Sequence, residues 1–182
     1  MKKIIIAIDS FKGCLTSAEA GKAAEKGIKS INPSCHTSVI PIADGGEGLL
    51  DVLITATKGK YITLSAHGPL MKMAKTHYGL SGNGRTAIIE MAAISGLPLV
   101  PIEQRNPMLT TTFGTGELIK DALNKGCRNF IIGIGGSATN DAGLGMLQAL
   151  GFRFLDKSGH TLGTGGQIMA VSYTHLTLPT IR

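Results

Sequence analysis

Four polar, glycine-rich segments carry the residues that could do chemistry in this chain. They are DSFKG at 9–13, ADGGEG at 43–48, TTTFGTGE at 110–117 and GIGGSATND at 133–141. Glycine lets a backbone approach an anion closely, and free N–H groups at the start of a helix bind one. Several such loops in one chain indicate an enzyme that handles phosphate groups.

The first two segments combine carboxylates with a lysine. Asp9 could hold Mg²⁺ or a substrate hydroxyl, and Lys12 could neutralise a phosphate; the alternative is a turn aspartate beside a solvated lysine. Asp44 and Glu47 flank two glycines, an arrangement that suits a metal or the hydroxyl of a sugar acid. The alternative makes Asp44 a helix N-cap and Glu47 its capping-box partner, which leaves the two glycines unexplained.

Other polar residues have weaker patterns. Glu90 follows the apolar run Ile88-Ile89, where a carboxylate needs a partner, so it is either catalytic or paired with Arg105. The five histidines show no spacing typical of metal ligands. No G-x-x-x-x-G-K-[ST] occurs, which excludes a P-loop at the level of the motif.

A partial dinucleotide-binding fingerprint keeps a second enzyme class open. Gly133-x-Gly135-x-x-Ala138 follows a strand-like run, and Asp156 lies about the right distance beyond it. This reading predicts an NAD(P)-dependent oxidoreductase that binds a nicotinamide and needs no Mg²⁺. Polar side chains crowd the turn, however, and indicate either a polar ligand or helix capping.

The elements that must position the first two loops form a repeated pattern. Apolar runs at 4–8 and 37–42 read as buried parallel strands, each followed by a polar loop and a helix. One helix is expected to begin after an N-cap at Thr16 or Ser17 and to end at Ile31, and a second is expected at 49–57. Strand, loop and helix in this order predict the βαβα opening of a doubly wound α/β sheet.

The pattern changes near residue 60. Three strand-like runs with short turns favour an antiparallel meander, and helical and strand-like segments alternate after it. The predicted strands are 61–65, 71–78, 85–90, 129–134 (a further buried strand) and 152–155, and the predicted helices are 91–95, 117–124 and 142–150. The expected fold class is therefore α/β, with a βαβα N-terminal portion and part of a second α/β domain with a mixed sheet.

Composition narrows the class of protein. Hydrophobic residues make up 43% of 182, charged residues 16% and aromatics 4%, which fits a folded aliphatic core and excludes disorder. The net charge of +6 is not clustered, so nucleic-acid binding is disfavoured. No apolar run reaches the ~20 residues of a membrane span. The three cysteines form no C-x-x-C pair, and we expect a cytoplasmic protein.

The last segment, VSYTHLTLPTIR at 171–182, differs in character from what precedes it. It holds no glycine and no acid and continues no periodicity. It could be an ordinary strand-like tail, but it resembles translated adapter sequence at the end of an assembled read. We expect it to be non-native.

Taken together, the motifs resemble those of the bacterial type I glycerate kinase family. The stretches that carry the resemblance are DSFKG, PIADGGEG, IEMAAISGL, RNPMLTTTFGTGELI and GIGGSATNDAGLGMLQALG, in the family's order over residues 1 to about 170. The resemblance implies transfer of the ATP γ-phosphate to D-glycerate, with Mg²⁺. It also implies a discontinuous flavodoxin-like domain, here 1–60, an inserted α/β domain, here 61–170, and an active site in the cleft between them.

Matching the motifs residue by residue gives the candidate site. Lys12 or Arg105 would stabilise the transferring phosphate, and Asp44 or Asp141 would orient the attacking hydroxyl. The expected catalytic residues are Asp9, Lys12, Asp44 and Asp141. The expected substrate- or phosphate-binding residues are Ser10, Gly45, Gly46, Glu47, Glu90, Arg105, Thr111, Thr115, Gly135, Gly136, Ser137, Thr139 and Asn140. No residue is assigned as a metal ligand.

The chain departs from the family in length, since members are about twice as long. The return of the chain to the first domain is then missing, and we expect exposed strand edges. A non-catalytic ligand-binding fragment is therefore the third hypothesis, and the oligomeric state stays open.

Overall fold

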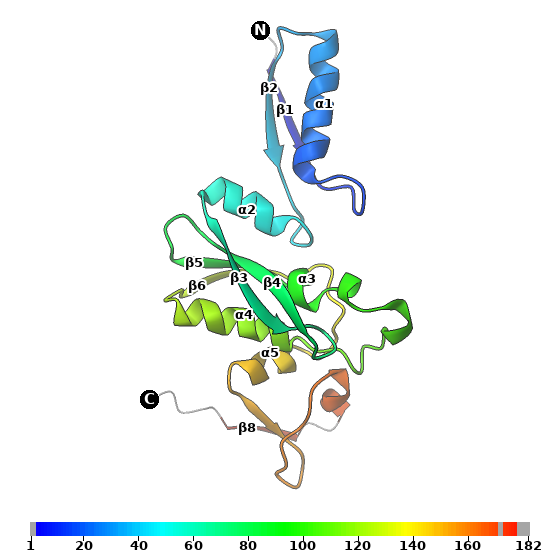
Figure 1. Cartoon of the computed structure of the whole chain (residues 1–182), viewed down its shortest axis with the longest axis vertical. Coiled ribbons are helices and arrows are strands. Elements are labelled where there is room, and N and C mark those ends of the chain that lie inside the picture. Colours follow the sequence, from blue (N-terminus) through cyan, green and yellow to red (C-terminus); the bar gives the residue numbers. More distant parts are fainter. Residues whose placement is uncertain (1–2, 171–172, 178–182) are drawn as a thin grey trace.

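The computed structural model describes residues 3–170 and 173–177, and it has a mixed α/β fold (Figure 1). Its strands form three sheets, ordered β1-β2, β3-β4-β5-β6 and β7-β8. The strands are β1 (Lys3–Ile8), β2 (His36–Pro41), β3 (Lys60–His67), β4 (Met73–Leu80), β5 (Thr86–Glu90), β6 (Asn129–Gly133), β7 (Arg153–Leu155) and β8 (Tyr173–Thr177). The α-helices are α1 (Ser17–Ile31), α2 (Leu49–Thr57), α3 (Ala92–Ser95), α4 (Phe113–Asn124) and α5 (Leu144–Ala149), with short 3₁₀ turns at Leu97–Leu99, Ile102–Gln104 and Gly166–Ala170.

The N-terminal unit consists of β1, α1 and β2. The two strands pair in parallel, as predicted, and α1 packs on them (Figure 1). Thr16 caps α1 through a capping box with Glu19, in which each side chain accepts the other's backbone N–H. Of the two predicted N-caps, Thr16 is confirmed, and Ser17 is the first residue of the helix.

The prediction that β1 and β2 are buried is wrong for most of their residues. Ile6 is buried, but Ile5 is 61% exposed and Ile40 49% exposed. A helix on one face of a two-stranded sheet leaves the apolar side chains of the other face in water.

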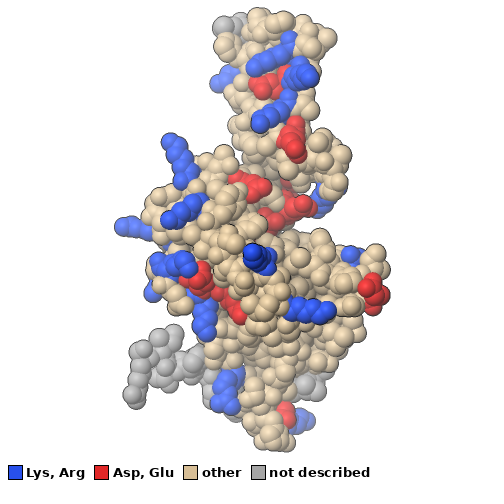
Figure 2. Space-filling model, viewed as in Figure 1, with Lys and Arg blue, Asp and Glu red and all other residues tan. Residues whose placement is uncertain are grey.

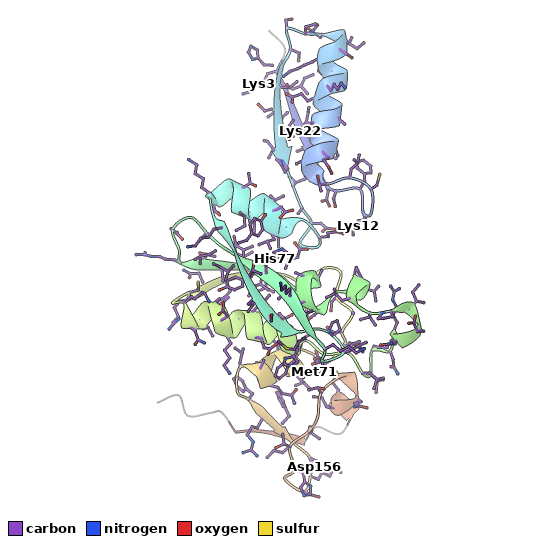
Figure 3. The ribbon with its side chains drawn as sticks, in the orientation of Figure 1. Lys3, Lys12, Lys22, Met71, His77 and Asp156 are labelled. Carbon is purple, nitrogen blue, oxygen red and sulfur yellow. The ribbon has the colours of Figure 1, made fainter. Side chains whose placement is uncertain are left out.

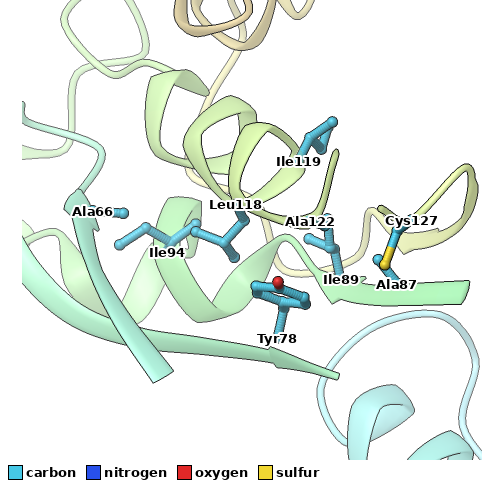
Figure 4. Packing of buried hydrophobic residues seen from close by; sticks show 9 residues of the cluster. All are labelled: Ala66, Tyr78, Ala87, Ile89, Ile94, Leu118, Ile119, Ala122 and Cys127. Atoms are coloured by element: carbon cyan, nitrogen blue, oxygen red, sulfur yellow. The ribbon is translucent and has the colours of Figure 1, made fainter. Parts of the chain in front are cut away.

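The four-stranded sheet holds the largest core. β3, β4 and β5 form the predicted antiparallel meander, and β6 adds in parallel to β5, so the sheet is mixed. Ile88 and Ile89 are neighbours on β5 and therefore point to opposite faces. Ile88 packs with Leu50 and Ile54 of α2. Ile89 belongs to the larger cluster with α3 and α4, which includes Ala66, Tyr78, Ile94 and Leu118 (Figure 4).

Helix α4 begins at Phe113, four residues before the predicted start at 117. Gly114 and Gly116 argue against a helix on propensity alone. A Cβ at Gly114 would overlap the carbonyl oxygen of His67, and one at Gly116 would overlap that of Met146. Tertiary packing therefore requires glycine inside this helix, and it overrides the local preference.

Other predicted boundaries also need correction. Strand β4 starts at Met73 rather than at 71, because Met71 has a φ of 58° in the preceding turn. Helix α5 covers Leu144–Ala149 rather than 142–150, because Ala142 and Gly143 have φ values of 50° and 76°. Strand β6 is not buried, since it forms an edge of its sheet and Ile131 is 42% exposed.

Helix α2 packs on β4 and β5 of the four-stranded sheet, although the predicted domain boundary at 60 groups it with β1 and β2. The division into domains at 1–60, 61–170 and 171–182 stays a prediction. Within the last segment, the backbone at Tyr173–Thr177 forms β8 antiparallel to β7, and 171–172 and 178–182 lie outside the described residues.

Charged side chains are distributed over the surface without a single basic patch on the face seen in Figure 2. Acidic side chains gather there at the junction between the N-terminal unit and the sheet below it. Among the described helices, none is long and apolar enough to cross a bilayer.

Candidate active site

The loops after β1 and β2 are held together by Ser17, the first residue of α1. Its hydroxyl donates to the carbonyl of Ile8 at 2.7 Å and accepts from the N–H of Ile42 at 3.0 Å. The side chain is buried, so both bonds are shielded from water. This contact fixes the starts of the two loops that carry Asp9 and Asp44. The sequence indicated Ser17 only as an alternative N-cap.

The second and fourth glycine-rich loops meet backbone to backbone. The N–H of Gly135 donates to the carbonyl of Gly45 at 3.1 Å. A Cβ on Gly135 would lie 2.7 Å from the Cα of Gly46, and one on Gly133 would lie 2.5 Å from the carbonyl oxygen of Gly45. Several glycines of these motifs are therefore required by close approach of the two loops.

Glu90 connects the end of β5 to the start of α2. Its Oε2 accepts from the N–H groups of Gly48 and Leu50, each at 3.2 Å. Burial raises the pKa of the Glu90 carboxyl, the two N–H bonds act in the opposite direction, and the charges of Asp51 and Glu47 raise the pKa further. The carboxylate satisfies two backbone donors at the helix start, where negative charge is favourable.

Two structural predictions are wrong: that Asp44 is the N-cap of α2, and that Glu90 pairs with Arg105. Helix α2 is capped at Gly48, which has a φ of 91°, and Asp44 instead accepts from the N–H of Gly46 at 3.0 Å. Glu90 is not paired with Arg105, whose Nε donates to the carbonyl of Val100 at 3.3 Å.

The polar ends of β1, β2 and β5 open onto a cavity of about 670 Å³. Its lining includes the predicted residues Asp9, Ser10, Lys12, Glu47, Glu90 and Gly136. Lys12 lies on the loop after β1 and His77 lies on β4, so the two residues line this cavity from two different elements (Figure 3). The Lys12 Nζ lies 4.0 Å from Asp44 Oδ2, and both side chains are exposed, so this weak pair leaves Lys12 able to contact a ligand.

Sequence reasoning missed Asp51 and His77, which also line this cavity. Asp51 accepts from the Tyr61 hydroxyl at 2.6 Å, and this bond is the main reason that the pKa of Tyr61 rises to about 12. The His77 ring meets the Tyr61 ring edge-on, with centroids 5.6 Å apart. Alternation along β4 could have placed His77 on the face opposite Tyr78, but not beside the loops.

Asp141 does not lie at this cavity. It is 1% exposed, and its carboxylate accepts from the N–H groups of Thr112 at 2.8 Å, Gly143 at 3.1 Å and Gly145 at 3.2 Å. Thr111 also donates to it through its hydroxyl at 3.1 Å. This carboxylate satisfies backbone donors at the starts of α4 and α5, so its position argues against the predicted catalytic role.

The remaining predicted residues are divided between the interior and a second cavity. Thr115 is buried and exchanges a hydrogen bond with Ser95 at 2.9 Å. Arg105, Ser137 and Thr139 line a cavity of about 270 Å³ on the other side of the loop. Asn140, the residue after Thr139, is exposed and does not belong to the lining of this cavity.

The dinucleotide fingerprint finds no support in the local structure. The fingerprint requires a glycine turn that opens directly into a helix. Here residues 134–143 separate the end of β6 from the start of α5. Asp156, the acidic residue of the partial fingerprint, accepts from the N–H groups of Ser158 and His160 in its own turn.

A model of the glycerate kinase family matches residues 4–177. This chain belongs to the glycerate kinase family. It is 56% identical over 164 residues to a glycerate kinase of Bacillus subtilis, covering 90% of this chain and 43% of that protein. It is 51% identical over 164 residues to a glycerate 2-kinase of Escherichia coli, again covering 90% of this chain and 43% of the relative.

A solved structure described as glycerate kinase 2 of Salmonella typhimurium LT2 superposes with a TM-score of 0.81 at 47% identity. The match covers 95% of this chain and 47% of that one. This glycerate kinase family chain thus spans less than half the length of these relatives.

Proposed function

We propose that the protein to which this chain contributes transfers the γ-phosphate of ATP to D-glycerate, in the cytoplasm, with glycerate and ATP as its partners. The observation that carries the proposal is the cavity of about 670 Å³ at the polar ends of β1, β2 and β5. Its size suits a nucleotide. Its lining combines the Lys12 ammonium with the carboxylates of Asp9 and Glu47, a mixture that fits a metal–phosphate complex.

Mg²⁺ fits this set of residues. Among the described residues, no three acidic, histidine or cysteine side chains converge into a complete metal cage. Mg²⁺ commonly takes one or two carboxylates together with substrate phosphates and water, so Asp9 and Glu47 would be enough to hold it. When bound, the ion would neutralise charge on the phosphates.

The chain's own residues supply positioning and charge. Lys12 is exposed at the cavity, and among the described residues its one ion pair is the weak contact with Asp44, so its ammonium is able to bind the transferring phosphate. Asp44 is the better candidate for orienting the acceptor hydroxyl, because the buried carboxylate of Asp141 already accepts from backbone N–H groups and from threonine hydroxyls. Ser17 and Glu90 act as positioning residues for the two loops.

The test is Mg²⁺-dependent release of ADP from ATP with D-glycerate. It uses this chain and a version completed with the C-terminal half of a relative. Lys12→Met in the completed protein is expected to lower kcat by about 10²–10³, the range for loss of one donor that stabilises developing charge in a transition state. Lys26→Met, an exposed position on α1, serves as the matched control. A folded completed protein that releases no ADP would refute the proposal.

A further inference from the structure

The second cavity lies beside the first and shares a wall with it. Gly136 lines the first cavity and Ser137 lines the second. The wall is held by backbone contacts, since the N–H of Leu97 donates to the carbonyl of Gly136 at 2.9 Å and Gly96 forms an isolated β-bridge with Ser137. The two cavities therefore have a fixed relation to each other through this segment.

The second cavity has a cation and no acid. Its lining residues are Leu97, Val100, Arg105, Asn106, Pro107, Thr110, Ser137, Ala138 and Thr139. In the part of the chain that the structure describes, no carboxylate lies within ion-pair distance of Arg105. The first cavity, in contrast, is lined by Asp9, Glu47 and Glu90 as well as Lys12.

One hydrogen bond orients the guanidinium of Arg105 and leaves its terminal NH₂ donors available. Its Nε donates to the carbonyl of Val100 at 3.3 Å, which anchors one edge of the guanidinium. The two terminal NH₂ groups keep donors that can bind an oxyanion at two points.

The hydroxyl groups of this cavity also leave a donor. The N–H of Thr139 donates to the Ser137 hydroxyl oxygen at 3.0 Å, and the two hydroxyl oxygens lie 2.7 Å apart. Whichever hydroxyl donates in this pair, the other keeps its hydrogen, so one hydroxyl donor remains available to a ligand. The hydroxyl of Thr110 is committed to the carbonyl of Ala138 at 2.8 Å.

We infer that this cavity is a binding site for a small oxyanion, the carboxylate of a hydroxy acid or a phosphate group, separate from the nucleotide cavity. A guanidinium and a hydroxyl donor without a competing acid favour an anion, and a volume of about 270 Å³ favours a ligand smaller than a nucleotide. If the anion is the carboxylate of glycerate, this inference rests on the proposed function. It then places glycerate on one side of residues 136–137 and ATP on the other.

NMR of the 182-residue chain can test this site without turnover. We expect D-glycerate to shift the backbone N–H signals of Asn106, Ser137 and Thr139, and glycerol, which lacks the carboxylate, to leave them unchanged. Inorganic phosphate in a parallel titration distinguishes the two sources of the anion. Shifts confined to the residues of the first cavity would overturn the inference.

Substitution of Arg105 sharpens the test. Arg105→Gln should raise the Kd for glycerate about tenfold or more, as expected for loss of charge-assisted hydrogen bonds. Arg105→Lys should recover part of the affinity, and Arg85→Gln, in the exposed turn before β5, is the matched control. Unchanged affinity in Arg105→Gln would refute the site.

Chemical modification of the unaltered chain gives an independent readout. Glycerate should slow the reaction of phenylglyoxal with Arg105 but not with Arg85, as followed by mass spectrometry, and equal slowing at both would count against the site. The two proposals fail separately. Binding at Arg105 without phosphorylation in the completed protein would sink the kinase proposal alone, and phosphorylation without binding at Arg105 would sink this inference alone.

Discussion

The environment of Glu90 has opposing effects on the pKa of its carboxyl group. Burial disfavours the charged form and raises its pKa above the ordinary value of 4.5, while the N–H groups of Gly48 and Leu50 favour the charged form. Burial is the larger effect, so the folded chain holds this proton more tightly than the unfolded chain. Its contribution to stability is therefore fully present below the ordinary pKa and is lost as pH rises through the folded-state pKa.

Glu90→Gln should remove this dependence on pH. The glutamine carbonyl can still accept the two N–H bonds, but no buried charge develops as pH rises. As pH rises from the ordinary pKa of 4.5 through the raised folded-state pKa, the Tm of the variant should therefore increase relative to the original chain. Circular dichroism melts at several pH values measure the difference, with Glu103→Gln in the exposed 102–104 turn as control. A difference that stays constant over this range would contradict the assignment.

At the scale of the elements, the starts of α4 and α5 depend on one side chain. Neither helix has a side-chain cap of the ordinary kind at its N-cap residue. Asp141 fills this role for both, because its carboxylate accepts from Thr112 at one helix start and from Gly143 and Gly145 at the other. The glycine-rich segment 133–141, which ends at Asp141, is thereby held against the core around α4.

Asp141→Ala should destabilise the chain by about 3 kcal/mol or more, since buried N–H groups at both helix starts lose their acceptor. Asp141→Asn should be intermediate, because its amide retains one acceptor oxygen. Urea unfolding measures the change, and Asp156→Ala, in an exposed turn, should cause a much smaller loss. A fully stable Asp141→Ala variant of the completed protein that has lost only turnover would restore the catalytic interpretation.

The whole molecule divides into two parts of different core size. The main contacts of α1 are with β1 and β2, and the buried apolar residues of this unit are Ile6, Ala20 and Cys35. The four-stranded sheet instead buries Tyr78, Ile88, Ile89, Ile94 and Leu118 completely. Since local stability follows buried apolar contact, the N-terminal unit should open more readily than the sheet.

Hydrogen exchange should resolve this difference. The N–H groups of β1 and β2 are expected to exchange about tenfold or more faster than those of β4 and β5, because they open without unfolding of the larger core. NMR-detected exchange of the 182-residue chain at one pH measures both sets in the same sample. Equal protection of the two sets would show that the chain unfolds as one cooperative unit.

Local signals in the sequence were enough to predict many of the elements. The bounds of α2 at 49–57 and the start of α1 after Thr16 agree with the structure, because caps and glycine stops act within a few residues. The antiparallel meander followed from short turns between strand-like runs. The motifs of the loops were enough to identify the family.

The tertiary structure decided which of the motif residues share a site. Glu90 meets Gly48 and Leu50 across about 40 positions of sequence, and Asp141 meets Thr112 across 29. No local pattern encodes such pairs, since they depend on how α2 and α4 pack against the sheet. The same packing buried Asp141, required glycines inside α4, and placed Arg105 in a cavity apart from Lys12. Sequence alone indicated most of the elements and the family, whereas long-range contacts decided which of these residues are buried and which line the two cavities.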